Sequence, residues 1–138
     1  MTWQASVFPE ARDRLRELEA ELWAPGRMDP VILELCRLRL AQLLGDRLGV
    51  DQRTPAAVEA GLTDEDVAEL AHWPTSGRVD ARTRACLAFT ELYVIDAHAV
   101  TDKVCGELRA ELSDGEAVAL TMALATFDAT SRLRVVFA

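Results

Sequence analysis

Cysteine is scarce in this sequence, and the cysteines present do not form a group. Among 138 residues there are three, Cys36, Cys86 and Cys105, with no Cys-x-x-Cys pair, and there are only two histidines. An odd number of widely separated cysteines excludes a disulfide framework and offers no clustered ligands for zinc. We therefore expect reduced thiols, no metal site and no cofactor.

Positively charged residues are also fewer than negatively charged ones. The chain has 15 Lys and Arg against 23 Asp and Glu, which gives a formal net charge of −8. Proteins that bind nucleic acid or anionic lipid usually carry a basic patch that attracts phosphate. We therefore expect neither nucleic acid nor a membrane surface as a partner.

Long apolar runs are missing as well. The longest, residues 117–127, is shorter than the roughly 18–20 residues that a membrane-spanning helix needs. Near the N-terminus, Pro9 and Glu10 occur before any apolar stretch accumulates, unlike the pattern of a secretory signal. Together with the scattered thiols, these features predict a cytoplasmic protein.

Helical periodicity, by contrast, is present almost everywhere. Half of the residues are apolar and 28% are charged, as in ordinary globular domains, and the length suits a single domain over residues 1–138. Apolar residues recur at helical spacing, whereas the alternation typical of strands is almost absent. The sequence therefore predicts an all-α bundle of about six to seven helices.

Capping residues mark where several of these helices should begin and end. Pro9 suits the first position of a helix, and Asp29 before a proline should cap a buried helix that ends at Gly45. Asp80 should cap another helix, preceded by a loop over residues 73–77. We expect this helix to bury one apolar stripe, formed by Ala85, Ala88, Phe89, Leu92 and Ile95.

The last predicted helix is unusually apolar in its first half. Ser113 and Glu116 form a capping box, and residues 117–127 are apolar on all sides and rich in small side chains. Such a segment is buried within a domain or between subunits. We therefore expect a homo-oligomer.

Glu34 is the first candidate for chemistry. Its neighbours on the predicted helix are Val31, Leu38 and Ala41, so this carboxylate shares a face with apolar side chains. Desolvation would raise its pKa and prepare it for proton transfer. The alternative is a structural ion pair with Arg37, one helical turn away.

Three sequence blocks resemble one family. Residues 34–45 read E-L-x-R-L-R-x-x-Q-x-x-G, residues 81–91 resemble a second helix start of that family, and residues 127–132 follow its late helix. In order and spacing they resemble the alkylhydroperoxidase-like, or carboxymuconolactone decarboxylase, superfamily over about residues 25–138. The resemblance implies a helical bundle that forms dimers, trimers or hexamers.

The resemblance also shows what this chain lacks. Peroxidase members carry a Cys-x-x-Cys twelve residues after the glutamate and a histidine four residues later; here those positions hold Asp46, Gly49 and Arg53. Peroxide reduction needs one thiolate to attack oxygen and a second thiol to resolve the sulfenic acid. We therefore expect no dithiol peroxidase activity, although the family label implies a peroxiredoxin-like one.

Asp46 admits two interpretations. Aspartate is a favoured helix cap, which requires no catalytic role. Alternatively, Glu34 and Asp46 face one cavity as a catalytic carboxylate pair with separated pKa values, one acting as acid and one as base.

The decarboxylase branch of the superfamily works without redox thiols, which suggests substrate-binding candidates for a small carbonyl or carboxylate compound. These are Arg37, Arg53, Arg132, Asp128 and His98; Ser131 and Thr130 also replace residues typical of the family. If the chain is an enzyme, lyase or isomerase chemistry is expected. The alternative is a non-catalytic oligomer or ligand-binding protein whose site has decayed.

Overall fold

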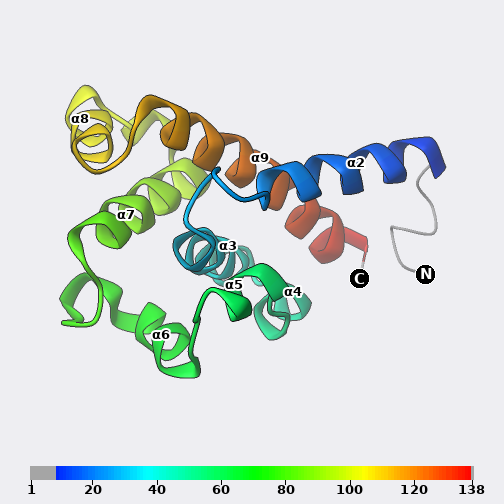
Figure 1. Cartoon of the computed structure of the whole chain (residues 1–138), viewed down its shortest axis with the longest axis horizontal. Coiled ribbons are helices and arrows are strands. Elements are labelled where there is room, and N and C mark those ends of the chain that lie inside the picture. The colour runs from blue at the N-terminus through cyan, green and yellow to red at the C-terminus, as the bar shows by residue number, and fades with distance from the viewer. Residues whose placement is uncertain (1–8, 138) are drawn as a thin grey trace.

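The computed structural model describes residues 9–137, and the predicted all-α fold is confirmed: no strand occurs in that range. Figure 1 shows α3 at the centre, α7 and α9 packed around it, and α2 lying along α9. The elements are α2 (Pro9–Leu22), α3 (Pro30–Leu44), α4 (Arg47–Asp51), α5 (Pro55–Glu59), α6 (Asp64–Ala68), η1 (Glu69–Thr75), α7 (Ala81–Ile95), η2 (Ala97–Ala99), α8 (Asp102–Glu111) and α9 (Asp114–Phe137).

The predicted caps account for the helix boundaries. The Asp29 carboxylate accepts hydrogen bonds from the first amides of α3, and Gly45 ends that helix in the left-handed conformation at φ 72°. Asp80 accepts from the Thr83 amide at the start of α7. Each bond satisfies a backbone donor or acceptor that the helix end would otherwise leave open.

Helix α3 forms the core of the domain. Its side chains are buried on several sides, as the sequence predicts, and they contact α7 and α9. Leu38, Leu40 and Ala41 are completely inaccessible to solvent, and so is the charged residue Glu34. The surroundings of α3 therefore place a carboxylate inside an apolar core, where it needs a partner.

The buried face of α7 differs from the predicted stripe. Ile95 is exposed, and the buried residues of α7 are Thr83, Cys86, Leu87, Phe89 and Thr90. A threonine can lie in this core because the Thr90 hydroxyl donates a hydrogen bond of 2.8 Å to the Cys86 carbonyl. Of the predicted stripe, Phe89 is buried and Ala85 and Ala88 pack against the core, so helical spacing identified only part of the buried face.

The predicted loop over residues 73–77 is partly helical. The 3-10 helix η1 continues to Thr75, because the indole of Trp73 is buried and donates a hydrogen bond of 2.8 Å to Glu91. Arg39 donates to the same Glu91 oxygen at 2.7 Å, which ties η1 to α3 and α7. His72, which precedes Trp73 in η1, is exposed.

The apolar first half of α9 is buried on one side within the domain. The core includes Leu120, Ala123, Leu124 and Phe127 from this segment. On the other side of the helix, Val118 is 59% exposed and Met122 is 50% exposed. The segment is thus only partly covered by its own chain. The homo-oligomer stays a prediction.

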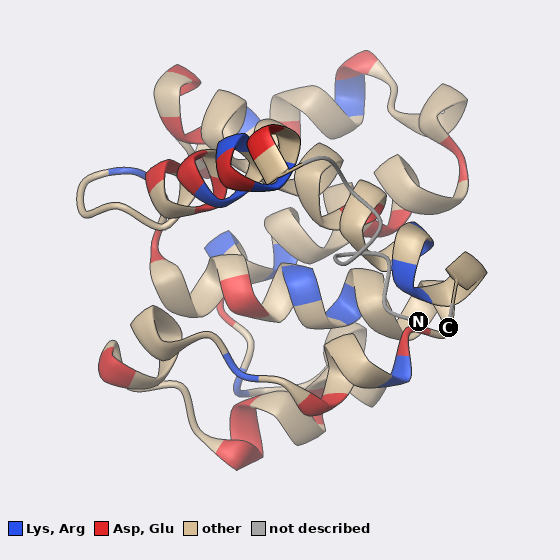
Figure 2. Cartoon of the chain, turned by 90° about the vertical axis from the view of Figure 1, so that its right-hand side faces the viewer, with Lys and Arg blue, Asp and Glu red and all other residues tan. Residues whose placement is uncertain are grey.

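Charge is dispersed over the molecule. Figure 2 shows Lys and Arg scattered among Asp and Glu, without a separate basic stripe in the described part. Within residues 9–137 no helix is long and apolar enough to span a bilayer. The expectation about a secretory signal concerns residues that lie largely outside this range.

Candidate functional site

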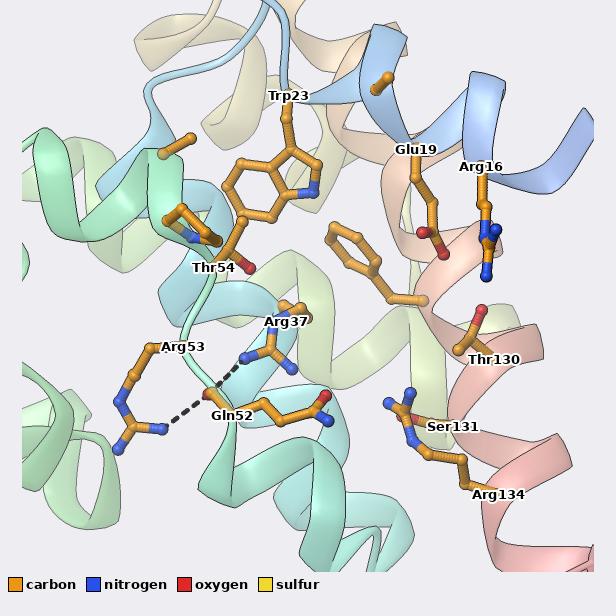
Figure 3. A pocket seen from close by; sticks show the side chains of 14 residues that line it. Arg16, Glu19, Trp23, Arg37, Gln52, Arg53, Thr54, Thr130, Ser131 and Arg134 are labelled. Atoms are coloured by element: carbon orange, nitrogen blue, oxygen red, sulfur yellow. Dashed lines mark hydrogen bonds between the residues drawn. The ribbon is translucent and has the colours of Figure 1, made fainter. Parts of the chain in front are cut away.

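A cavity of about 610 Å³ lies between α2 and α9, above the connection from α4 to α5. We call it the α2–α9 cavity (Figure 3). One wall is formed by Arg16, Glu19 and Ala20 from α2 and by Trp23 directly after it, and the other by Phe127, Thr130, Ser131 and Arg134 from α9. The floor is formed by Arg37, Gln52, Arg53, Thr54, Pro55 and Ala56. Its volume is typical of small-molecule sites.

Glu34 lies behind the cavity floor in a closed network. One carboxylate oxygen accepts from Arg37 Nε, and the other accepts from the Thr54 backbone amide. The Arg37 guanidinium also donates to the carbonyls of Gly49 and Gln52, each at 2.9 Å. The structural ion pair considered from the sequence is therefore present, and it anchors the α4–α5 connection to α3.

Asp46 is the centre of a second network. Its carboxylate caps α4 through the Gly49 amide at 3.0 Å, accepts from the Ser131 hydroxyl at 2.7 Å, and pairs with Arg134 Nη2 at 2.8 Å. Burial raises the pKa of Asp46, but the hydrogen bonds from Arg134, Gly49 and Ser131 outweigh it and hold the pKa below its ordinary value. Asp46 is therefore an ionised structural anchor for α9.

Gly49 connects the two networks. Its carbonyl accepts from Arg37 and its amide donates to Asp46, so Glu34 and Asp46 lie on either side of one peptide segment. A Cβ atom at Gly49 would come within 2.4 Å of Asp46 Oδ2 and 3.0 Å of Arg134 Nη2. The Asp46–Arg134 pair thus occupies the space that a side chain would need here.

The two ion pairs have the same orientation relative to the cavity. Arg37 and Arg134 line it, whereas Glu34 and Asp46 are not lining residues and are 0% and 3% exposed. Each pair therefore presents its cation to the α2–α9 cavity and keeps its anion behind. The proposed catalytic pair of Glu34 and Asp46 shares one network, but the structure does not bring either carboxylate to the cavity surface.

Two further arginines line the cavity without a carboxylate partner among residues 9–137. Arg53 donates through Nη1 to the carbonyls of Val50 and Gln52, at 2.6 and 2.9 Å. Arg16 forms no side-chain hydrogen bond or ion pair within the described range. Figure 3 shows these two arginines at opposite sides of the cavity. A ligand would therefore meet mostly positive charge.

Three of the predicted substrate-binding residues do not line the cavity. Asp128 and Arg132 pair with each other at 2.8 Å on an outer face of α9. His98 is exposed on η2, where its amide donates to Asp96. The cavity-facing residues of α9 are spaced three and four apart, so Asp128 and Arg132 project from a different side of the helix.

Sequence reasoning missed the contribution of α2 and of Arg134. Arg16 and Glu19 on α2, and Trp23 directly after the helix, recur at the same spacing as the cavity-facing residues of α9. That spacing of polar residues on an amphipathic helix was available as a signal, but it is also typical of a solvated surface. Only the packing of α2 on α9 distinguishes a cavity wall from a solvated surface.

The thiols lie away from the cavity. Cys36 and Cys86 are completely buried, and burial raises the pKa of Cys36 to about 12. Cys105 is partly exposed beside Leu108 and Met122, on another face. Over the described part of the chain, no three His, Cys, Asp or Glu side chains gather as a metal site would require. The site's chemistry therefore rests on guanidinium, carboxylate and hydroxyl groups.

Comparison with known proteins gives three findings. The model of the carboxymuconolactone decarboxylase family matches residues 9–92. The uncharacterized proteins MT2376 and Rv2313c, from two strains of Mycobacterium tuberculosis, are each 36% identical over 95 residues; the match covers 68% of this chain and 33% of each relative. This chain thus spans about a third of the curated relatives it matches.

The third finding is structural. The fold is similar to the crystal structure of ATU0492 from Agrobacterium tumefaciens, described as a protein of unknown function and a candidate antioxidant defence protein AhpD. The TM-score is 0.85 at 25% sequence identity, and the similarity covers 96% of this chain and 91% of the other.

The Asp46–Arg134 pair should contribute strongly to stability. Asp46→Asn leaves a mostly buried guanidinium without its carboxylate, and we expect a loss of about 3 kcal/mol in the free energy of unfolding at pH 7. Because the folded-state pKa of Asp46 is lowered, the wild type's advantage is present above the ordinary pKa of aspartate and disappears as the pH falls through the lowered one. Urea unfolding of both proteins across this pH range measures it; equal stability at pH 7 contradicts the assignment.

Gly49 should tolerate no side chain. Gly49→Ala forces Asp46 and Arg134 apart, and we expect a destabilisation of about 1–3 kcal/mol. Gly106→Ala in α8 is the matched control, because a Cβ there meets nothing within 4 Å and should stabilise the helix by about 0.5–1 kcal/mol. The midpoints of chemical denaturation should shift in opposite directions for the two variants, to lower denaturant for Gly49→Ala and to higher denaturant for Gly106→Ala. Similar midpoint shifts for the two variants would show that the Asp46–Arg134 pair moves to make room for the added methyl group.

Proposed function

Since this chain belongs to the carboxymuconolactone decarboxylase family, we propose that it binds a small carboxylate or carbonyl compound in the α2–α9 cavity and acts on it without sulfur redox chemistry. The observation that carries this proposal is the orientation of the two buried ion pairs. Arg37 and Arg134 face the cavity while their carboxylates lie behind them. The cavity surface is therefore suited to an organic anion.

The remaining lining residues support the same ligand class. Arg16 and Arg53 add cationic donors, and guanidinium groups recognise carboxylates through paired N–H bonds. Trp23 and Phe127, whose ring centroids are 5.9 Å apart, form an apolar wall for the rest of the molecule. A compound with one anionic end and one flat or apolar end fits these two surfaces.

A ligand-binding protein without catalysis is the second candidate. It is favoured by the engagement of Glu34 and Asp46, whose oxygens all accept hydrogen bonds from protein groups. A carboxylate held in this way is a poor acid or base, since proton transfer would first break its ion pair. Turnover would then need another titratable group in the cavity.

Peroxidase activity, suggested by the description of the similar structure from Agrobacterium tumefaciens, is the third candidate. The described residues that line the cavity include no thiol, and the positions of the family's two redox cysteines hold Asp46 and Gly49. The burial that raises the pKa of Cys36 to about 12 disfavours the thiolate needed for attack on peroxide.

Hydroperoxide reduction should therefore be absent. With dithiol reductants, we expect consumption of an alkyl hydroperoxide at the rate without protein, because no thiol in the described cavity can attack the peroxide. The measurement is peroxide loss over time, with Cys36→Ser as the control. Protein-dependent turnover that this substitution removes would overturn the thiol argument.

Benzoate should bind in the α2–α9 cavity more tightly than benzamide, its uncharged analogue of similar shape. Arg16→Gln should weaken benzoate binding about tenfold, the effect of one charge-assisted hydrogen bond. Arg14→Gln is the matched control, because Arg14 lies on the same helix, is exposed and pairs with Glu17. Calorimetric titration measures all four cases; equal affinities for benzoate and benzamide contradict anion recognition.

A further inference from the structure

Glu19 is the acidic residue that lines the α2–α9 cavity in the described structure. It comes from α2, is partly buried, and points into the cavity opposite α9 (Figure 3). Unlike Glu34 and Asp46, its carboxylate accepts no hydrogen bond and forms no ion pair within 4 Å from any group in residues 9–137. The Glu19 carboxylate can therefore bind a proton without breaking a contact within the described structure.

A second unsatisfied group faces the same space. The Thr130 hydroxyl is buried and has no hydrogen-bond partner within the described range, although it lines the cavity. Figure 3 shows it below Glu19 and Arg16, on the opposite wall. A buried hydroxyl without a partner carries a cost in free energy that a ligand oxygen could offset. Two polar side chains from different helices thus lie at one part of the cavity without a hydrogen-bond partner among residues 9–137.

The charges around Glu19 define what this part of the cavity can accept. Arg16 on α2 and Arg134 on α9 act on its carboxylate, and Arg37 and Arg53 lie across the cavity floor. An anion drawn in by these arginines would approach an ionised Glu19 and be repelled by it. A protonated Glu19 would instead donate a hydrogen bond to the anion.

We propose that Glu19 is the proton-carrying residue of the cavity, and that a small carboxylate binds together with one proton taken up by Glu19. This inference rests on the proposed function, since it assumes that the ligand is an organic anion. The proton comes from solvent and forms an O–H bond on one Glu19 oxygen. That hydroxyl then donates to the bound carboxylate, and the Thr130 hydroxyl donates to the same carboxylate.

The charges and burial around Glu19 agree with this assignment. Burial raises the pKa of Glu19, and the nearby positive charges of Arg134 and Arg16 reduce the increase without cancelling it. The free protein therefore already favours the neutral acid more than an exposed glutamate does. An arriving anion shifts Glu19 in the same direction, because like charges at short distance cannot both remain ionised.

Proton uptake can be measured directly with benzoate as the probe. Titration in two cationic buffers of different ionisation enthalpy gives the number of protons bound with the ligand. At a pH above the pKa of Glu19 in the free protein, where this carboxylate is ionised, we expect one proton for the wild type. Affinity should fall about tenfold for each pH unit above the pKa of Glu19, the linkage expected for one proton. Glu19→Gln should bind benzoate without proton uptake and without this pH dependence.

The control is Glu17→Gln on the same helix. Glu17 is exposed and pairs with Arg14 outside the cavity, so this variant should retain the proton uptake of the wild type. A carbon-detected nuclear magnetic resonance titration of Glu19, with and without benzoate, gives its pKa directly and does not depend on heats of binding. We expect the pKa of Glu19 to rise when benzoate is present.

The possible results distinguish the role of Glu19 from the proposed function of the cavity. Benzoate binding with an unchanged pKa of Glu19, or with equal proton uptake in wild type and Glu19→Gln, overturns the role of Glu19 and leaves the proposed function intact. If benzoate does not bind to the wild type, the proposed function and this inference are both overturned.

Discussion

The need of two buried carboxylates for cationic partners shapes the whole site. Glu34 and Asp46 are almost completely removed from solvent, and an unpaired charge in such a place would cost several kcal/mol. Arg37 and Arg134 provide the partners, and the Gly49 peptide connects the two pairs. Helices α3, α4 and α9 are therefore held in one arrangement by charge pairing as well as by apolar packing.

This arrangement changes what a scaffold of this family can do. The positions that hold redox thiols in the family's peroxidases hold Asp46 and Gly49 here, and Arg134 closes over both. The two positions depend on each other, because the Asp46 carboxylate that pairs with Arg134 lies where a Cβ at residue 49 would be. The cavity is then lined by Arg37 and Arg134, whose counter-charges lie behind them, and this arrangement supports the proposed binding of an organic anion.

The sequence predicted the fold better than the site. Caps at Asp29, Asp80 and Gly45 are local features, so they were visible without tertiary structure. The burial of Glu34 and its pairing with Arg37 also followed from helical spacing. The burial of Thr90 on α7 did not follow, because its hydroxyl is satisfied on its own helix and the side chain then packs like an apolar residue.

For the cavity, the sequence by itself determined which chemical groups are available: arginines and carboxylates, with no paired thiols. The tertiary structure alone decided that Arg134 rather than Arg132 turns inward, and that Glu19 rather than Glu34 or Asp46 lines the cavity. The physical reason is that local spacing sets the faces of each helix. Which face meets a cavity depends on how α2 and α9 pack against the rest of the chain.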